Sequence, residues 1–125
     1  MKSIILFSFL LTASFAACNG PQNTRNFIPG TYVNYAEGEF SVAYDTLIIQ
    51  PLSGKKGTYR ILRKSAYRRI EHNRLQPVVH KKEEWTGLYN DETKSMQETR
   101  HGRVITFYPE ARRLMVEKRE YEKID

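Results

Sequence analysis

The sequence predicts an all-β protein, a small antiparallel meander of about eight strands that closes or partly closes into a barrel. Three observations support this fold class. From Ile28 onward, apolar and aromatic residues recur at every second position, the period of a half-buried strand. Turn-forming residues interrupt this alternation about every ten residues. No stretch shows an apolar pattern of helical period that would predict a long helix.

The first half of the domain supplies four predicted strands. Asp45 is expected to begin a tight turn or to form a bulge between the second and third strands, because aspartate is depleted in strands. Pro51 ends the third strand, since proline cannot donate to a sheet ladder. The strands are expected at residues 30–35, 39–44, 46–50 and from residue 58, with residues 67–72 continuing the fourth strand or forming another.

The second half begins with a long strand from Val78 to Tyr89, which carries Trp85 and has Gly87 as a candidate bulge. The clearest hairpin follows at residues 89–94, where an Asn/Asp-rich centre bends the chain through side-chain to backbone hydrogen bonds. Later strands are expected at residues 95–99, 103–108 and 112–117, with residues 118–125 able to continue the last one.

A meander of this length protects its edges and buries one face most simply by closing into a barrel. The segment Pro29-Gly30-Thr31-Tyr32 resembles the Gly-x-aromatic opening of lipocalin-like domains, with tyrosine in place of the usual tryptophan. The resemblance implies a lipocalin-like barrel architecture. Lipocalins proper are longer, and no ligand is carried over from them.

The first 17 residues have the layout of a secretory signal peptide, with Lys2 before an apolar run from Ile4 to Phe15. This run is shorter than the roughly 20 residues that a transmembrane helix needs. The segment from Ser14 to Cys18 resembles the lipobox of bacterial lipoproteins, which implies that Cys18 carries acyl chains and begins the mature chain. Phe15 departs from that pattern, where aliphatic residues are more common, so ordinary signal-peptidase cleavage is the alternative.

The predicted organisation therefore has three parts: a lipoprotein signal peptide at residues 1–17, a lipidated cysteine with a flexible tether at residues 18–27, and a single β-barrel domain at residues 28–125. Cys18 is the lipid-attachment residue, and as the only cysteine it cannot form a disulfide within the chain. The membrane is thus an expected partner, through the acyl chains on Cys18.

The whole chain is similar to small Bacteroidota envelope lipoproteins of unknown function, some of which look as if they travel with mobile elements. The residues that carry this likeness are Ile28-Pro29-Gly30-Thr31-Tyr32-Val33, Asp45-Thr46-Leu47 and Thr106-Phe107-Tyr108-Pro109. Asn19 follows the cysteine, without the aspartate or the acidic run that act as sorting signals in such lipoproteins. By this resemblance we expect the outer membrane with the domain facing the periplasm, ahead of display on the cell surface.

The chain is basic, with 20 Lys and Arg against 14 Asp and Glu, which favours acidic partners. Several Lys and Arg residues stand in adjacent pairs, such as Arg68-Arg69 and Lys118-Arg119. Adjacent residues of a strand face opposite sides, so one member of each such pair can point into the barrel. An interior lined by Arg60, Arg69 or Arg119 would indicate an anionic ligand, although strand ends are the commoner place for such residues. Nucleic acid is not an expected partner.

No pattern in the sequence predicts catalysis, and no cofactor is expected. His72, His80 and His101 lack the spacing of a metal site, and no serine lies in a Gly-x-Ser-x-Gly elbow. Carboxylates cluster at residues 83–84 and 91–92, where cross-strand ion pairs are the ordinary explanation. Three further questions stay open at this point: which ligand-binding residues exist, which partner the protein has, and how many copies associate.

The predicted function is therefore that of a non-catalytic envelope lipoprotein that binds another protein, as an accessory or modulator of a membrane-associated assembly. The alternative is a carrier or binder of a small or polyanionic ligand, through the mouth of the barrel and its basic rim. An inhibitor of a secreted enzyme ranks below both, because the chain is itself basic and has no disulfide. An open cavity lined by aromatics and arginines would favour the carrier, and a filled barrel would favour the outer surface.

Overall fold

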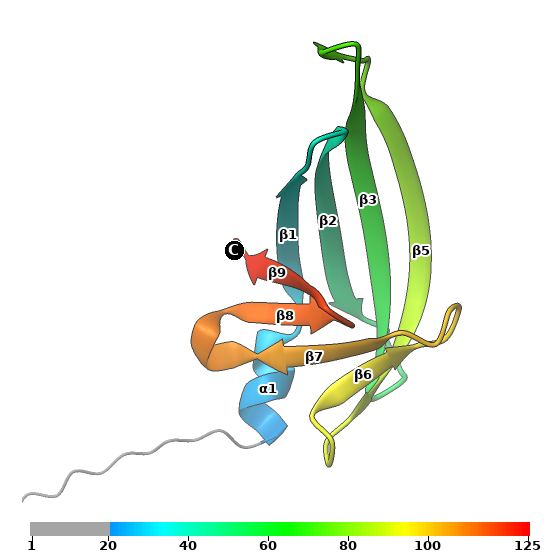
Figure 1. Ribbon diagram of the computed structural model, residues 1–125. Helices are drawn as coiled ribbons and strands as arrows, with labels where there is room; N and C mark the ends of the chain where they lie inside the picture. The colour runs from blue at the N-terminus through cyan, green and yellow to red at the C-terminus, as the bar shows by residue number, and fades with distance from the viewer. Residues whose placement is uncertain (1–20) are drawn as a thin grey trace, which may run out of the picture.

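The computed structural model describes residues 21–125, with side chains described from residue 24 onward. Eight antiparallel strands close into a barrel in the order β1-β2-β3-β5-β6-β7-β8-β9, and β9 returns to β1 (Figure 1). The all-β barrel is thereby confirmed. The elements are α1 (Pro21–Phe27), β1 (Gly30–Glu37), β2 (Ser41–Pro51), β3 (Thr58–Glu71), β4 (Arg74–Leu75), β5 (Val79–Asn90), β6 (Ser95–Glu98), β7 (Val104–Tyr108), the 3-10 helix η1 (Pro109–Ala111), β8 (Arg113–Val116) and β9 (Arg119–Lys123).

The strands fall into two length classes, and this difference shapes the molecule. β1, β2, β3 and β5 have 8 to 14 residues, whereas β6 to β9 have 4 or 5. The short strands therefore complete the barrel only at its lower part, beside α1 (Figure 1). Above them the four long strands continue as a curved, open sheet, and the short β4 extends its tip by pairing with the end of β3.

The lower part of the barrel is filled by its own side chains. Tyr32 packs edge-on against Phe27 of α1, with ring centroids 5.7 Å apart, and its hydroxyl oxygen lies 2.9 and 2.8 Å from the carbonyl oxygens of Phe27 and Ile28. Helix α1 thus closes the lower end. The buried core consists of Phe27, Ile28, Tyr32, Leu47, Ile49, Tyr59, Ile61, Trp85, Met96, Ile105, Phe107, Leu114, Val116 and Tyr121.

Two predicted strand boundaries are wrong. Asp45 neither turns nor bulges the chain: β2 runs unbroken through it, paired with Asn34 on one side and Ser65 on the other. A buried aspartate is tolerated there because four side chains hydrogen-bond to it. At the other end, β8 does not continue past Val116, because Glu117 adopts a left-handed conformation with φ 55° and turns the chain into β9.

Gly87 is not a bulge, since it pairs in register with Tyr59 and with Glu98. Close packing instead requires a glycine here: a Cβ at this position would lie 2.4 Å from the sulfur of Met96. The predicted hairpin at residues 89–94 is present, and Asn90 accepts the backbone N–H of Glu92 on its side-chain oxygen at 2.8 Å.

The second half of the predicted flexible tether, residues 21–27, is helical in the structure. Residues 21–27 form helix α1, and Thr24 and Phe27 are buried. The predicted signal peptide and Cys18 lie outside the described residues. Within residues 21–125, no helix has the length and hydropathy that a membrane crossing requires.

Candidate anion-binding cup

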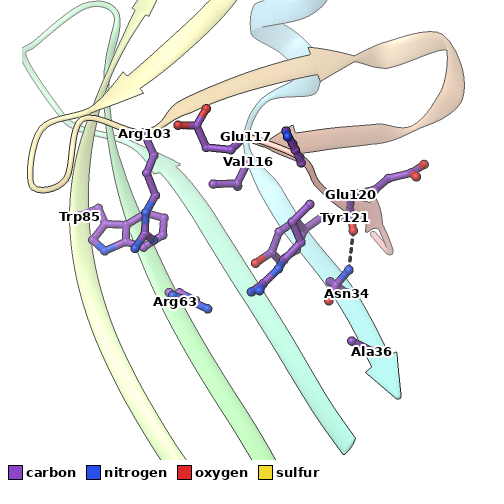
Figure 2. Close-up of a pocket in the computed structure, with 11 residues that line it drawn as sticks. Asn34, Ala36, Arg63, Trp85, Arg103, Val116, Glu117, Glu120 and Tyr121 are labelled. Carbon is purple, nitrogen blue, oxygen red and sulfur yellow. Dashed lines mark hydrogen bonds between the residues drawn. The ribbon is translucent and has the colours of Figure 1, made fainter. Parts of the chain in front are cut away.

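An open hollow of about 620 Å³ lies at the upper end of the filled core, where the short strands stop (Figure 2). We call this hollow the cup. Side chains from β1, β3, β5, β8 and β9 and from the loops before β7 and β9 line it: Asn34, Ala36, Arg63, Trp85, Arg103, Val116, Glu117, Lys118, Arg119, Glu120 and Tyr121. The barrel is therefore neither empty throughout nor completely filled.

Trp85 forms part of the floor of the cup and is 2% exposed. The guanidinium carbons of Arg63 and Arg103 lie 5.7 and 5.2 Å from its ring centroid, within range of cation–π attraction. Figure 2 shows Arg103 reaching down from its loop to the indole. Since guanidinium groups are weakly hydrated, cation–π attraction to the indole favours these two positions over the ring.

Asp45 anchors the adjoining wall and is 4% exposed. Its carboxylate accepts hydrogen bonds from Arg63 at 2.7 Å, from Ser65 at 2.9 Å, from Tyr121 at 2.6 Å and from Arg119 at 3.1 Å. Burial alone would raise the pKa of Asp45, but the hydrogen bonds from Arg63, Tyr121 and Ser65 outweigh burial and lower it.

The same network acts on its donors. Burial, followed by the hydrogen bond to the Asp45 carboxylate, raises the pKa of Tyr121 to about 12. The hydrogen bond to Asp45 likewise raises the pKa of Arg63. Asp45 is therefore an ionised acceptor that holds Arg63 and Tyr121 in fixed positions at neutral pH.

Glu83 orients the tryptophan from the other side. It accepts a hydrogen bond from the indole N–H of Trp85 at 2.9 Å, and this bond is the main reason that the pKa of Glu83 is lowered. One nitrogen of Arg63 lies 3.9 Å from this carboxylate, and Nε2 of His101 lies 4.0 Å from it. The position of Trp85 is thus fixed by a hydrogen bond as well as by packing.

The lining of the cup contains four cations and two carboxylates. Arg63 is neutralised by Asp45, and Glu120 forms an ion pair with Arg113. Within residues 24–125, by contrast, the side chain of Arg103 makes no hydrogen bond or ion pair with a protein group, although its guanidinium lies over the ring of Trp85. Lys118 is exposed at the rim, and Arg119 shares its single acceptor, Asp45, with Arg63. Glu117 also lines the cup, and Glu83 interacts electrostatically with Arg103, so the cup keeps a positive charge that the protein offsets only in part.

A second hollow of about 330 Å³ continues from the cup along the concave face of the open sheet. It shares Asn34, Ala36, Arg63 and Arg119 with the cup, and farther up small side chains such as Ala43 and Ser65 leave room. Space for a ligand larger than a single inorganic ion therefore exists.

Of the three arginines singled out in the sequence, only Arg119 lines the cup. Arg60 lies on the outer face, paired with Glu84 at 2.8 Å, and Arg69 is exposed and lines neither hollow. Arg63 and Arg103 were missed. Arg63 shares strand parity with the buried Tyr59 and Ile61, and this signal could have placed it on the inner face. No comparable signal existed for Arg103, which precedes its strand.

The three histidines lie in separate places: His72 in the turn after β3, His80 on β5 and His101 in the loop before β7. In the described part of the chain, no group of three or more His, Cys, Asp or Glu side chains is arranged to hold a metal ion. The prediction that the protein is not an enzyme stays a prediction.

Comparisons with protein-family models, with curated proteins and with solved structures found no match to this chain. The resemblances to lipocalin-like domains and to Bacteroidota lipoproteins therefore stay predictions. The structural result is the small closed barrel and its cationic cup.

Proposed function

We propose that this protein is a non-catalytic cell-envelope lipoprotein, anchored through Cys18, whose barrel binds a small or polyanionic ligand in the cup. Of the two functions considered from the sequence, the geometry favours this one. The outer membrane with the domain facing the periplasm remains the proposed location.

The observation that carries the proposal is the guanidinium of Arg103. It is held against Trp85, faces an open hollow and has no protein acceptor among the described residues. Arg119 and Lys118 border the same space. Carboxylates and phosphates match the planar fork of a guanidinium, and charge-assisted hydrogen bonds to them are stronger than neutral ones. A ligand with one or two such groups complements the cup.

The sequence contains a single tryptophan, so tryptophan fluorescence reports on the cup alone. We expect citrate or pyrophosphate, used as probes, to change this fluorescence saturably, with an affinity that falls as salt is added. Isothermal titration calorimetry then gives the dissociation constant. Arg103→Gln should weaken binding about tenfold or more, because it removes a charge-assisted hydrogen bond.

Arg74→Gln is the matched control, since Arg74 is an exposed arginine on β4 at the far tip and lines neither hollow. It should leave the dissociation constant unchanged. Absence of saturable binding for both probes, or equal loss in the two variants, would contradict the proposal.

A second candidate is the protein-binding accessory role, favoured by exposed apolar side chains at the tip of the open sheet. Phe40 is 71% exposed, and the hydrogen bond from the N–H of Ile70 to its carbonyl, 2.8 Å long, brings it beside the end of β3. Leu75 and Val78 are also exposed there. A photo-crosslinker at position 40 should capture a defined protein in intact cells, and one at Lys56 in the β2–β3 loop should not. Capture from neither position would count against this role.

A further inference from the structure

Above the closed part of the barrel, strand β5 has a free edge. Residues 79–88 pair with β3 on one side, whereas β6 pairs only with residues 87–90 on the other. The carbonyl of Thr86 also accepts the N–H of Thr99. Among the described residues, no strand pairs with the outer edge of residues 79–85, and Figure 1 shows this edge on the outside of the open sheet.

The unpaired backbone groups of this edge can be assigned. Alternate residues of an antiparallel strand direct both backbone groups to the same side. Thr86 directs its carbonyl away from β3, whereas the N–H of Tyr89 donates to Gly57 on the β3 side. The N–H and C=O groups of His80, Lys82 and Glu84 therefore face outward. Such a row is a template for a further strand.

The charges along this edge are complementary to those of an identical edge that approaches antiparallel. Residues 81–84 read Lys-Lys-Glu-Glu, so an identical strand approaching antiparallel presents Glu-Glu-Lys-Lys. Two registers bring the outward-facing backbone groups of both copies together near the centre. One places Lys82 opposite Glu84 of the second copy, twice, and the other places Lys81 opposite Glu83, twice. Cross-strand pairs of opposite charge stabilise sheet pairing.

We propose that two copies of this chain associate by antiparallel pairing of their β5 edges over residues 79–85. The two open sheets then form one continuous sheet across a two-fold axis. The interface is isologous, as closed dimers require, because the same segment serves both copies. This inference stands on backbone pairing and charge order, and it is independent of ligand binding in the cup.

Lysines on an edge strand ordinarily oppose edge-to-edge pairing. Here two glutamates follow them directly, and antiparallel approach brings unlike charges together in both central registers. One pair of like charges remains at the two-fold axis. In the register that places Lys81 opposite Glu83, the two copies of Lys82 face each other there, and in the register that places Lys82 opposite Glu84, the two copies of Glu83 do. Within its own chain Glu83 already faces Arg63 at 3.9 Å, which offsets part of that repulsion.

The first test is the association state of the full chain in detergent, measured by analytical ultracentrifugation over a range of concentrations. We expect a reversible monomer–dimer equilibrium. Lys82→Pro should raise the dimer dissociation constant about tenfold or more, because it removes an edge N–H from both copies without removing a bond to β3. Lys56→Glu, at an exposed position in the β2–β3 loop, is the control and should have no effect.

Charge reversal gives a sharper result. The chain with Lys81→Glu and Lys82→Glu and the chain with Glu83→Lys and Glu84→Lys should each be monomeric, and a 1:1 mixture should form a heterodimer. Circular dichroism confirms that each variant is folded. A monomeric wild-type chain at all concentrations, or dimerisation that Lys82→Pro and both charge variants leave unchanged, overturns the proposal.

Covalent trapping in intact cells identifies the register. The register centred on residue 83 predicts a disulfide-linked dimer for Glu83→Cys, and the register centred on residue 82 predicts it for Lys82→Cys, because a disulfide needs Cα atoms about 4.4–6.8 Å apart. The unsubstituted chain, whose only cysteine is Cys18, is the control. Linkage at neither position would contradict the proposed interface.

Discussion

Asp45 is the residue whose environment differs most from what its type suggests. Asp45 was expected to begin a turn or to form a bulge, yet it is buried in the middle of β2 and accepts hydrogen bonds from Arg63, Ser65, Tyr121 and Arg119. The four donors come from two strands, β3 and β9, so Asp45 of β2 joins three strands. Asp45 therefore links the upper surface of the core to the wall of the cup.

This arrangement gives a pH-dependent contribution to stability. The folded-state pKa of Asp45 is lowered, against an unfolded value of about 3.9. Its contribution is therefore fully present above about pH 4 and is lost as the pH falls through the folded pKa. We expect Asp45→Asn to reduce the free energy of unfolding by about 3 kcal/mol at pH 7, because Arg63 loses a buried ionic partner.

Urea unfolding at pH 7 and pH 3 measures this effect, and the difference between wild type and Asp45→Asn should shrink at pH 3. Glu122→Gln, at an exposed carboxylate on β9, is the control and should change stability little at either pH. A difference for Asp45→Asn that is constant with pH would contradict the assignment.

At the level of elements, the packing where β5 pairs with β6 depends on the absence of a side chain at Gly87. Gly87 faces Met96, and a Cβ there would also lie 3.0 Å from Ile61. Gly87→Ala should destabilise the protein by about 1–3 kcal/mol through overpacking. Since the nearest atoms belong to the flexible side chain of Met96, Gly87→Ala combined with Met96→Ala should cost less than the sum of the two single changes.

Thermal or urea unfolding of the two single variants and the double variant gives the coupling energy. Gly54→Ala is not informative as a control, because Gly54 has a positive φ of 80°. Gly38→Ala is suitable, since a Cβ there meets only one atom, at 3.9 Å. Strict additivity of the Gly87 and Met96 changes would show that the close contact is not the cause.

For the whole molecule, closure of the barrel depends on its last strand. Only two residue pairs join β1 to β9, Tyr32 with Lys123 and Val33 with Glu122. Nearby contacts stabilise this junction between β1 and β9. The Thr31 N–H donates to the Asp125 carboxylate at 3.0 Å, and Tyr121 is part of the buried core. The C-terminal seven residues thus complete both the sheet and the core.

Deletion of residues 119–125 should therefore abolish cooperative thermal unfolding, followed by circular dichroism, because it exposes the core and creates two new sheet edges. Replacement of residues 70–77 by Asn-Gly is the matched control: it removes β4 and the tip but no residue of the core. It should retain a cooperative transition. Cooperative unfolding of the truncated chain would show that the barrel does not need β9.

Period-two alternation and turn residues were sufficient to predict the all-β class and the hairpin at residues 89–94, because these are local properties of the chain. The predicted count of about eight strands was right although two boundaries were wrong. The prediction divided β2 into two strands at Asp45 and merged β8 with β9 into one, so the two errors cancelled in the count. The cup was not predictable in this way. Alternation gives the face of a side chain but not its height in the barrel or its neighbours across the sheet.

Arg63 and Arg103 are 40 residues apart in the sequence, and both lie against the ring of Trp85 only because β5 pairs with β3 in one particular register and the short strands end below them. The same inequality of strand lengths leaves the β5 edge unpaired. Local patterning therefore fixed the fold class, whereas the cup and the free edge depend on register, strand length and closure, which long-range pairing sets.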